Sequence, residues 1–515
     1  MEAECIAALR GERLPASLDS VTLRSCVLRG IRHHDGFGIE LRESHSPPKT
    51  SYSASLIRAL NARAIMSNRI PDMAGPDEFP YCIWYPDTAE EHTYRLLAER
   101  YPDMRYLVGR ACAVAGYSAL FHELELLPDV SIAEEARDNE IKNGGKSRAI
   151  YDSIIHQPLR YAILDDYTRT SHHDNPRRVT GLNGDTATVS ELQHTRLGFR
   201  DAGYTGYRHF NITEDWCVSE EDTEELEPLP PGDDMTALLY SPLPMDLPAG
   251  NKNMLILMAA YYGDVDRYHR LRRPSKVRGE LEAVVRGIYH NTMFAMYIAS
   301  QLNAPAGSVL VPSSSSPIKI PISNNTVMHR AVIARCIMNN DLSRITDNLP
   351  TDALPYMIWY PDRAHPTTYE ELARRRLEAT PAVARACIVA DYKDVWDRLA
   401  WIPDDELLRE ARASPNPHYL QTLTARAENE TGLQQRTANK GASAWRMAMS
   451  ARHMNDRRPP TFLCPSISEE NFDWGQTGPY EGLQADAGEI ELFVSAPTRL
   501  RPLLGAHAID LTKGY

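Results

Sequence analysis

Small and apolar side chains recur at helical spacing along much of the chain, and several such runs stop at a glycine, asparagine or aspartate. Residues 112–116, 259–264 and 336–341 show this pattern, and apolar positions resume directly after each of them. Such a run predicts a small-residue helix, a left-handed turn and a second amphipathic helix. The sequence therefore predicts a mostly α-helical protein built from helix pairs.

A long internal repeat organises the chain. The phrase PYCIWYPD at 80–87 returns as PYMIWYPD at 355–362, an offset of 275 (355 − 80 = 275). The match continues without a gap, so that residues 80–137 align with residues 355–412. Two paired stretches of this length indicate a duplicated structural unit.

The repeat extends upstream at smaller offsets. Ala62 pairs with Ala334 at an offset of 272 (334 − 62 = 272), and Arg29 pairs with Arg286 at 257 (286 − 29 = 257). The second copy contains the proline- and serine-rich stretch 303–325, which predicts a loop inserted into the shared unit. We predict two related halves, at roughly 21–137 and 279–412.

The aromatic phrase predicts a short helix. Tyr81, Ile83 and Trp84 would form it, and Pro86 would end it, because proline cannot donate to a continuing hydrogen-bond ladder. A capping box would start the next helix, at 88–91 in one copy and at 367–370 in the other.

Recurring aromatic and thiol side chains favour packing roles. Trp84 and Trp359 could be ligand anchors, but their repetition within the shared unit favours core packing. Cys112 and Cys387 lie in small-residue helices, which predicts buried, unreactive thiols.

The helix-pair pattern resembles the ankyrin family. The best match is ILMAAYYGD at 256–264, although the chain lacks a TPLH tetrapeptide and its spacing varies. More broadly, residues 20–420 resemble uncharacterised ankyrin-like proteins of filamentous fungi, some encoded in secondary-metabolite clusters such as azaphilone pigment clusters. This resemblance implies a helical-repeat solenoid whose concave surface recognises proteins.

Composition narrows the classes of function. The 515 residues carry a formal charge of −13 with a pI near 5.7, which argues against direct binding of nucleic acid. No apolar run is long enough to cross a membrane, and the acidic N-terminus does not read as a signal peptide. The eight cysteines show no CxxC spacing. These features predict a cytoplasmic or nuclear protein.

Composition also predicts four regions. The first and second helical halves would occupy residues 1–170 and 251–425. A polar and then acidic, proline-rich connecting segment would lie at 171–250, and an irregular tail at 426–515.

Two histidine pairs are candidates for a metal-binding or acid–base role. They are His33-His34-Asp35 and His172-His173-Asp174. Vicinal histidines on one helix point about 100° apart, so they seldom bind one ion. His33 also recurs as His290 whereas His34 does not recur, which favours a packing role.

Three other stretches contain residues that are typical of catalytic sites. NGGKS at 143–147 ends like a P-loop but lacks the required upstream glycine, which predicts a turn. His122-Glu123 begins like a zinc protease motif, yet Leu126 stands where the second histidine should be. Asp165-Asp166 is expected to face water at a helix end.

The sequence therefore predicts no catalytic, cofactor-binding or metal-binding residue. We expect a non-catalytic protein-interaction or regulatory protein, and the fungal resemblance implies an accessory role in secondary-metabolite biosynthesis. The alternative is an enzyme whose site lies in the non-repeat segments 170–215 or 426–515. That site would bring Asp185 or Glu191 to the second histidine pair.

Overall fold

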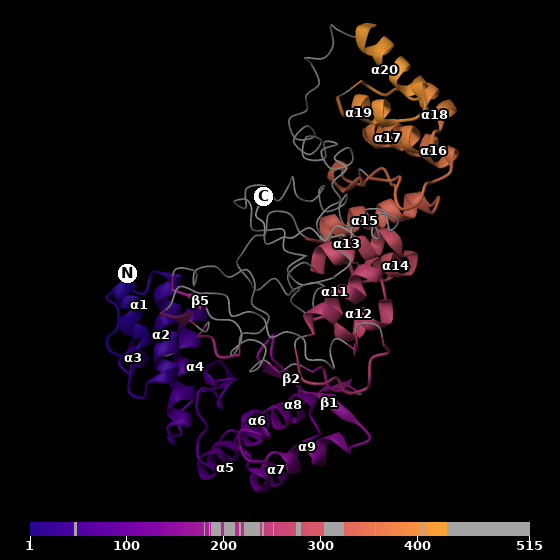
Figure 1. Cartoon of the computed structure of the whole chain (residues 1–515). Helices are drawn as coiled ribbons and strands as arrows, with labels where there is room; N and C mark the ends of the chain where they lie inside the picture. The colour runs from indigo at the N-terminus through magenta and orange to yellow at the C-terminus, as the bar shows by residue number, and fades with distance from the viewer. Residues whose placement is uncertain are drawn as a thin grey trace. The chain divides into compact units, whose positions relative to one another are not determined.

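A computed structural model defines the fold of most of the chain (Figure 1). The described residues are 1–45, 49–179, 181–184, 186, 197–199, 212–215, 218–220, 237–238, 241–250, 252–273, 280–302, 324–355, 357–403 and 405–429. The chain forms two compact units, Met1–Lys252 and Asn253–Tyr515. The predicted tail beyond residue 429 and most of the predicted acidic linker lie outside the described residues.

The first unit is mainly helical. Its helices are α1 (Glu2–Leu9), α2 (Val21–His33), α3 (Leu41–His45), α4 (Ser51–Met66), η1 (Pro76–Glu78), α5 (Glu91–Arg100), η2 (Pro102–Met104), α6 (Arg105–Ala115), α7 (Ser118–Glu123), α8 (Val130–Asn139) and α9 (Arg148–Ile155). α1 packs on α2, α2 on α4, and α6 on α8 (Figure 1).

Short strands follow these helices in the first unit. They are β1 (Arg160–Ala162), β2 (Leu164–Asp165), β3 (Thr170–Ser171), β4 (Arg177–Val179), β5 (Leu197–Gly198) and β6 (Val218–Ser219). β1 pairs with β4 and β2 with β3, both antiparallel, and β5 pairs with β6 in parallel. Among the described residues, no sheet has more than two strands, so helix packing supplies the core.

The second unit is also helical. Its helices are α11 (Asn253–Tyr262), α12 (Val265–Leu271), α13 (Glu280–His290), α14 (Thr292–Leu302), α15 (Asn324–Met338), η4 (Thr351–Ala353), α16 (Pro366–Arg375), η5 (Leu377–Ala379), α17 (Thr380–Ala390), α18 (Lys393–Arg398), α19 (Asp405–Ala413) and α20 (Pro417–Asn429). α11 packs on α13, and α13 on α15. A mostly helical protein is therefore confirmed. No helix in the described ranges is long and apolar enough to cross a membrane.

Within each unit, the first helix packs against a glycine of a later helix in the same way. A Cβ on Gly30 of α2 would lie 2.0 Å from the carbonyl oxygen of Ala8, and a Cβ on Gly287 of α13 would lie 2.0 Å from that of Ala260. Glycine at these positions lets the backbones of adjacent helices approach closely. The resemblance between the units therefore reaches α1 and α11, upstream of the predicted halves.

Left-handed turns end several helices, as the pattern predicted. Gly116 separates α6 from α7 at φ 80°, and Gly263 separates α11 from α12 at φ 68°. Asn340 ends α15 at φ 64°, but the second helix predicted after it does not form, because residues 341–349 are turns and irregular backbone. The helix–turn–helix prediction is thus correct at two of these three places.

The aromatic phrase is not a helix, which corrects the prediction for Tyr81, Ile83 and Trp84. These residues form irregular backbone that leads into a cis peptide bond before Pro86, and a cis bond recurs before Pro361. A side chain of helix α5 holds this backbone in place, because the Tyr94 hydroxyl donates to the Ile83 carbonyl oxygen at 2.7 Å. Tyr369 donates to Ile358 at the same distance in the second unit.

The predicted capping boxes are also wrong. α5 and α16 have Glu90 and His365 as their N-caps. The backbone N–H of each cap instead donates to an asparagine side chain, Asn68 at 2.7 Å and Asn340 at 2.6 Å. The turn residue of the preceding helix therefore fixes where the next helix begins.

Candidate functional site

The first histidine pair takes part in internal packing. His33 packs edge-on against the Tyr85 ring at 5.9 Å, and His290 packs on Tyr360 at 5.5 Å. Burial, reinforced by the charge of Arg29, lowers the pKa of His33 to about 4. His34 contacts the Leu9 carbonyl oxygen at 2.9 Å, so the two rings meet different partners.

The second histidine pair does not converge on a pocket. His172 is exposed and lies 3.9 Å from Asp165, while His173 is exposed and packs on Tyr106 at 5.1 Å. Asp174 is exposed as well. Asp185 and Glu191, the partners of the alternative enzyme prediction, lie outside the described residues.

The motif-like stretches occupy structural positions. NGGKS forms the turn between α8 and α9, as predicted, and the Asn143 side chain donates to the Val114 carbonyl at 3.2 Å. Glu123 pairs with Arg95 at 2.9 Å. Within the described ranges, no group of three His, Cys, Asp or Glu side chains could hold a metal ion.

A buried ion-pair cluster lies behind the aromatic phrase. The Arg110 guanidinium is fully buried and donates to Asp166 at 2.5 Å and to Glu135 at 3.1 Å. Tyr81 donates its hydroxyl to the same Asp166 carboxylate at 2.6 Å. The prediction that Asp166 faces water at a helix end is therefore wrong, because it follows strand β2 and accepts two donors from the core.

An equivalent arginine is buried in the second unit. Arg385 donates to Glu410 at 2.5 Å, and its guanidinium lies 5.5 Å from the centre of the Trp359 ring. Arg110 lies 4.9 Å from the Trp84 ring in the first unit. Both tryptophans are at most 3% exposed, which confirms core packing rather than an accessible ligand anchor.

The two recurring thiols are buried as predicted. Cys112 and Cys387 are fully inaccessible on α6 and α17. Burial raises the pKa of the Cys387 thiol to about 12 and also raises that of Cys112. A buried thiol with a raised pKa is a poor nucleophile.

An acidic segment, residues 212–215, is seated on α2 and α4. The fully buried Asp215 carboxylate accepts from Arg29 at 3.1 Å and from Thr213 at 2.5 Å. Glu214 accepts from Arg58 of α4 at 2.6 Å. Although burial alone would raise the Asp215 pKa, the charges of Arg29 and Arg32 hold it well below the usual range. Sequence reasoning missed these carboxylates because their partners are distant in the chain.

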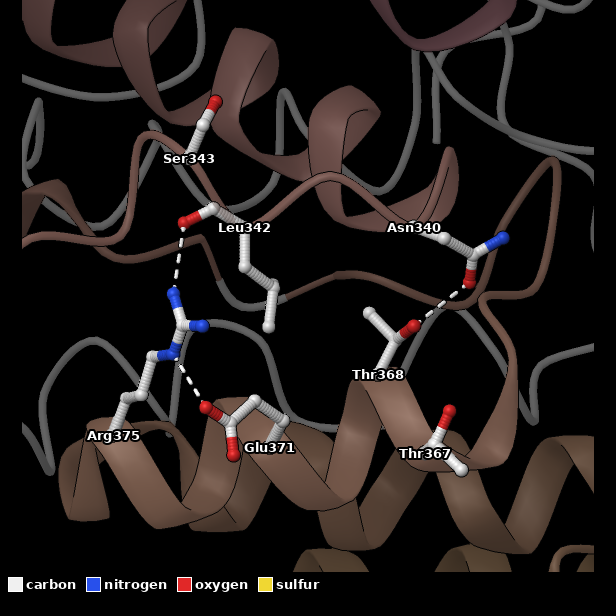
Figure 2. A pocket seen from close by; sticks show the side chains of 7 residues that line it. All are labelled: Asn340, Leu342, Ser343, Thr367, Thr368, Glu371 and Arg375. Carbon is white, nitrogen blue, oxygen red and sulfur yellow. Dashed lines mark hydrogen bonds and ion pairs between the residues drawn. The ribbon is translucent and has the colours of Figure 1, made fainter.

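An exposed polar pocket of about 430 Å³ lies in the second unit, between the turn after α15 and helix α16 (Figure 2). Its lining is Asn340, Leu342, Ser343, Thr367, Thr368, Glu371 and Arg375. Figure 2 shows Thr367, Thr368 and Glu371 on one helix, with Leu342 and Ser343 on the chain opposite.

Three hydrogen bonds fix the shape of this pocket. Thr368 donates to Asn340 at 2.9 Å, and Arg375 bridges Glu371 at 2.7 Å and the Leu342 carbonyl at 3.4 Å. Hydrogen bonds from Arg374 and Arg375 lower the Glu371 pKa to about 2, so this carboxylate stays ionised. The pocket offers hydroxyl groups and one paired carboxylate, which suit polar peptide groups better than an apolar molecule.

The aligned positions in the first unit have different chemistry. Thr367 and Glu371 align with His92 and Leu96, at the offset of 275 (367 − 92 = 275). Leu96 therefore stands where the second unit has the Glu371 carboxylate, and this apolar side chain is 40% exposed. By contrast, the asparagine that shapes the turn is kept as Asn68.

The fold and the site define a mostly α-helical protein. Several buried contacts recur in its two units, whereas the exposed positions differ between them. Residues 84–190 are similar to the family described as the YKP1 C-terminal domain. The match begins at Trp84 and runs through α5–α9 and β1–β4. No curated protein and no solved structure matches the chain.

Proposed function

We propose that this chain is a non-catalytic protein-interaction or regulatory protein built from two related, ankyrin-like helical-repeat halves. The supporting observation is a contrast between aligned positions of the two halves: buried ones are the same and exposed ones differ. Buried positions such as Trp84 and Trp359 have equivalent partners, whereas exposed positions such as Leu96 and Glu371 differ. Repeat proteins use internal positions for stacking and surface positions for recognition.

The buried polar groups also support a structural role for the shared residues. Arg110 pairs with two carboxylates, those of Glu135 and Asp166, inside the first unit. Asp129, which is fully buried, accepts backbone N–H groups from Ile132 and Ile163. These charges stabilise the fold and present no accessible reactive group.

The pocket between Asn340 and Arg375 is the proposed contact for a protein partner. An extended peptide could place backbone N–H and C=O groups against Thr367, Ser343 and Glu371. The fungal resemblance adds the proposal that this partner acts in a secondary-metabolite pathway, in the cytoplasm or nucleus.

Quantitative co-purification from the cells that express the chain tests this function. The tagged full chain is expected to retain a stoichiometric partner, and Thr367→Lys with Glu371→Lys should reduce its recovery at unchanged circular dichroism. The matched control is His92→Lys with Leu96→Lys, which changes the aligned positions of the first unit. Absence of a stoichiometric partner, or equal retention by both variants, would contradict the proposal.

A further inference from the structure

Two thiol groups meet where α1 packs on α2. Cys5 lies on α1 and Cys26 lies on α2, and both side chains are fully inaccessible. Their sulfurs lie within hydrogen-bond reach of each other. Both are free thiols in the structure, so a second covalent state of this pair is open to the chain.

The backbones of the two helices approach closely enough to favour a bond between these thiols. A Cβ added to Gly30 would lie 2.0 Å from the Ala8 carbonyl oxygen. Cys5 precedes Ala8 by three residues (8 − 5 = 3), and Cys26 precedes Gly30 by four (30 − 26 = 4), so the thiols occupy the adjacent turn of the same helix contact. A disulfide requires two Cα atoms within about 7 Å, and helices packed this tightly bring facing residues towards that range.

The second unit makes the same helix contact without thiols. A Cβ added to Gly287 would lie 2.0 Å from the Ala260 carbonyl oxygen. Leu257 and Ala283, three and four residues before these positions (260 − 257 = 3; 287 − 283 = 4), stand where the first unit has its two thiols. Both side chains are fully buried. Packing at this place therefore does not require sulfur, and the thiol pair adds chemistry that is specific to the first unit.

Access to the pair depends on local opening of α1. Burial raises the pKa of both thiols, although the hydrogen bond with Cys26 offsets part of the rise at Cys5. The helix has eight residues and no side-chain hydrogen bond at its N-cap, and the residues that it buries are Cys5, Ala7, Ala8 and Leu9. Because so little apolar surface holds α1 in place, it opens at a lower free-energy cost than the unit as a whole.

We propose that Cys5 and Cys26 form a reversible disulfide when the chain meets a peroxide, which joins α1 to α2. While α1 is open, the Cys5 thiolate attacks one oxygen of hydrogen peroxide, so that an S–O bond forms, the O–O bond breaks and one water leaves. The Cys26 sulfur then attacks the Cys5 sulfur, so that the S–S bond forms, the S–O bond breaks and a second water leaves. The two thiols lose two electrons and two protons, and the peroxide is reduced to two waters. This redox control goes beyond the proposed binding of a protein partner and does not depend on it.

Peptide mapping of the full chain after treatment with hydrogen peroxide tests the disulfide. Trypsin places the two thiols in the separate peptides MEAECIAALR and SCVLR, which should appear linked and should separate after reduction with dithiothreitol. Cys387 is the internal control, because it is a thiol whose pKa is raised by burial alone, and it should stay reduced. Amide hydrogen exchange in α1 should slow by about tenfold in the oxidised chain, since the new link opposes opening.

The matched variant is Cys26→Ala, because the second unit has alanine at the aligned position. It should abolish both the linked peptide and the slower exchange, whereas Cys387→Ala should leave both in place. If Cys26→Ala does not fold, the peptide map of the unaltered chain decides alone.

Three results would overturn the proposal. One is a pair of thiols that stays reduced at peroxide concentrations that oxidise free glutathione completely. Another is sulfonic acid at both positions with no linked peptide. The third is a covalent dimer on non-reducing electrophoresis that holds all of the linked peptide, which would place the bond between two copies of the chain.

Discussion

At the scale of single residues, buried arginines tie distant stretches of chain together. Arg110 joins α6 to Glu135 on α8 and to Asp166 beyond β2, and all three side chains are at most 10% exposed. Breaking such a pair leaves an uncompensated charge in the core, which costs far more than the loss of a surface pair. These contacts therefore stabilise the fold.

Replacing Asp166 by Asn should destabilise the full chain by about 2 kcal/mol, because Arg110 and Tyr81 would both lose a charged acceptor while Glu135 still pairs with Arg110. Urea unfolding measures the change. Glu123→Gln is the matched control, since it breaks an exposed, solvent-screened pair with Arg95 and should cost much less. Equal effects of the two substitutions would contradict the structural role of the buried cluster.

His33 makes stability depend on pH. Its folded pKa is lowered from 6.5 to about 4 by burial and by Arg29, so the unfolded chain binds the proton more readily between these values. Stability should be independent of this group above pH 6.5 and should fall as the pH drops from 6.5 towards 4. His33→Gln should flatten that decrease in chemical unfolding, whereas the exposed His172→Gln should not. An unchanged slope in His33→Gln would be the contrary result.

At the scale of elements, short contacts between backbones set the order of the helices. Gly30 lets α2 approach α1, and Gly287 lets α13 approach α11. Where a helix ends, Asn68 and Asn340 turn the chain in the left-handed region and accept the backbone N–H of the residue that caps the next helix. Small and turn-forming residues therefore determine how consecutive helices pack.

Substituting these helical glycines tests the close approach. Gly30→Ala and Gly287→Ala should each destabilise by at least about 2 kcal/mol, because the new Cβ would overlap a backbone carbonyl oxygen. Gly75→Ala is the control, since its backbone is extended and no atom lies within 4 Å of the added Cβ. Thermal unfolding of the three variants measures the difference. Tolerance of alanine at position 30 or 287 would show that these helices do not pack as described.

Local patterns predicted the helices but not the backbone between them. Periodicity located α6, α11 and their left-handed ends, because these features depend on neighbouring residues. The irregular stretch at Ile83 depends on Tyr94 and on Arg32, which donates to the Cys82 carbonyl at 3.1 Å from 50 residues away.

The candidate sites were harder to predict than the helices. Asp166 was misplaced because its partner Arg110 is 56 residues away. The pocket at Glu371 arises where a turn after α15 faces α16, and the spacing of residues along either stretch does not reveal that juxtaposition.

At the scale of the whole molecule, several buried contacts of the first unit recur in the second. Tyr94, Tyr117 and Ala89 form one chain of hydrogen bonds, and Tyr369, Tyr392 and Ala364 form its counterpart. Contacts of this kind support the proposed relationship between the two halves, and the exposed positions around them are where the halves differ.

A crystal structure of the full chain tests this relationship most directly, through the surroundings of Trp84 and Trp359. We predict that both indoles are buried beneath an arginine, Arg110 and Arg385, beside a cis-proline turn and a tyrosine that donates to the backbone. A solvent-exposed Trp359, or one packed in a different kind of structure from Trp84, would contradict the view that both units share one helical design.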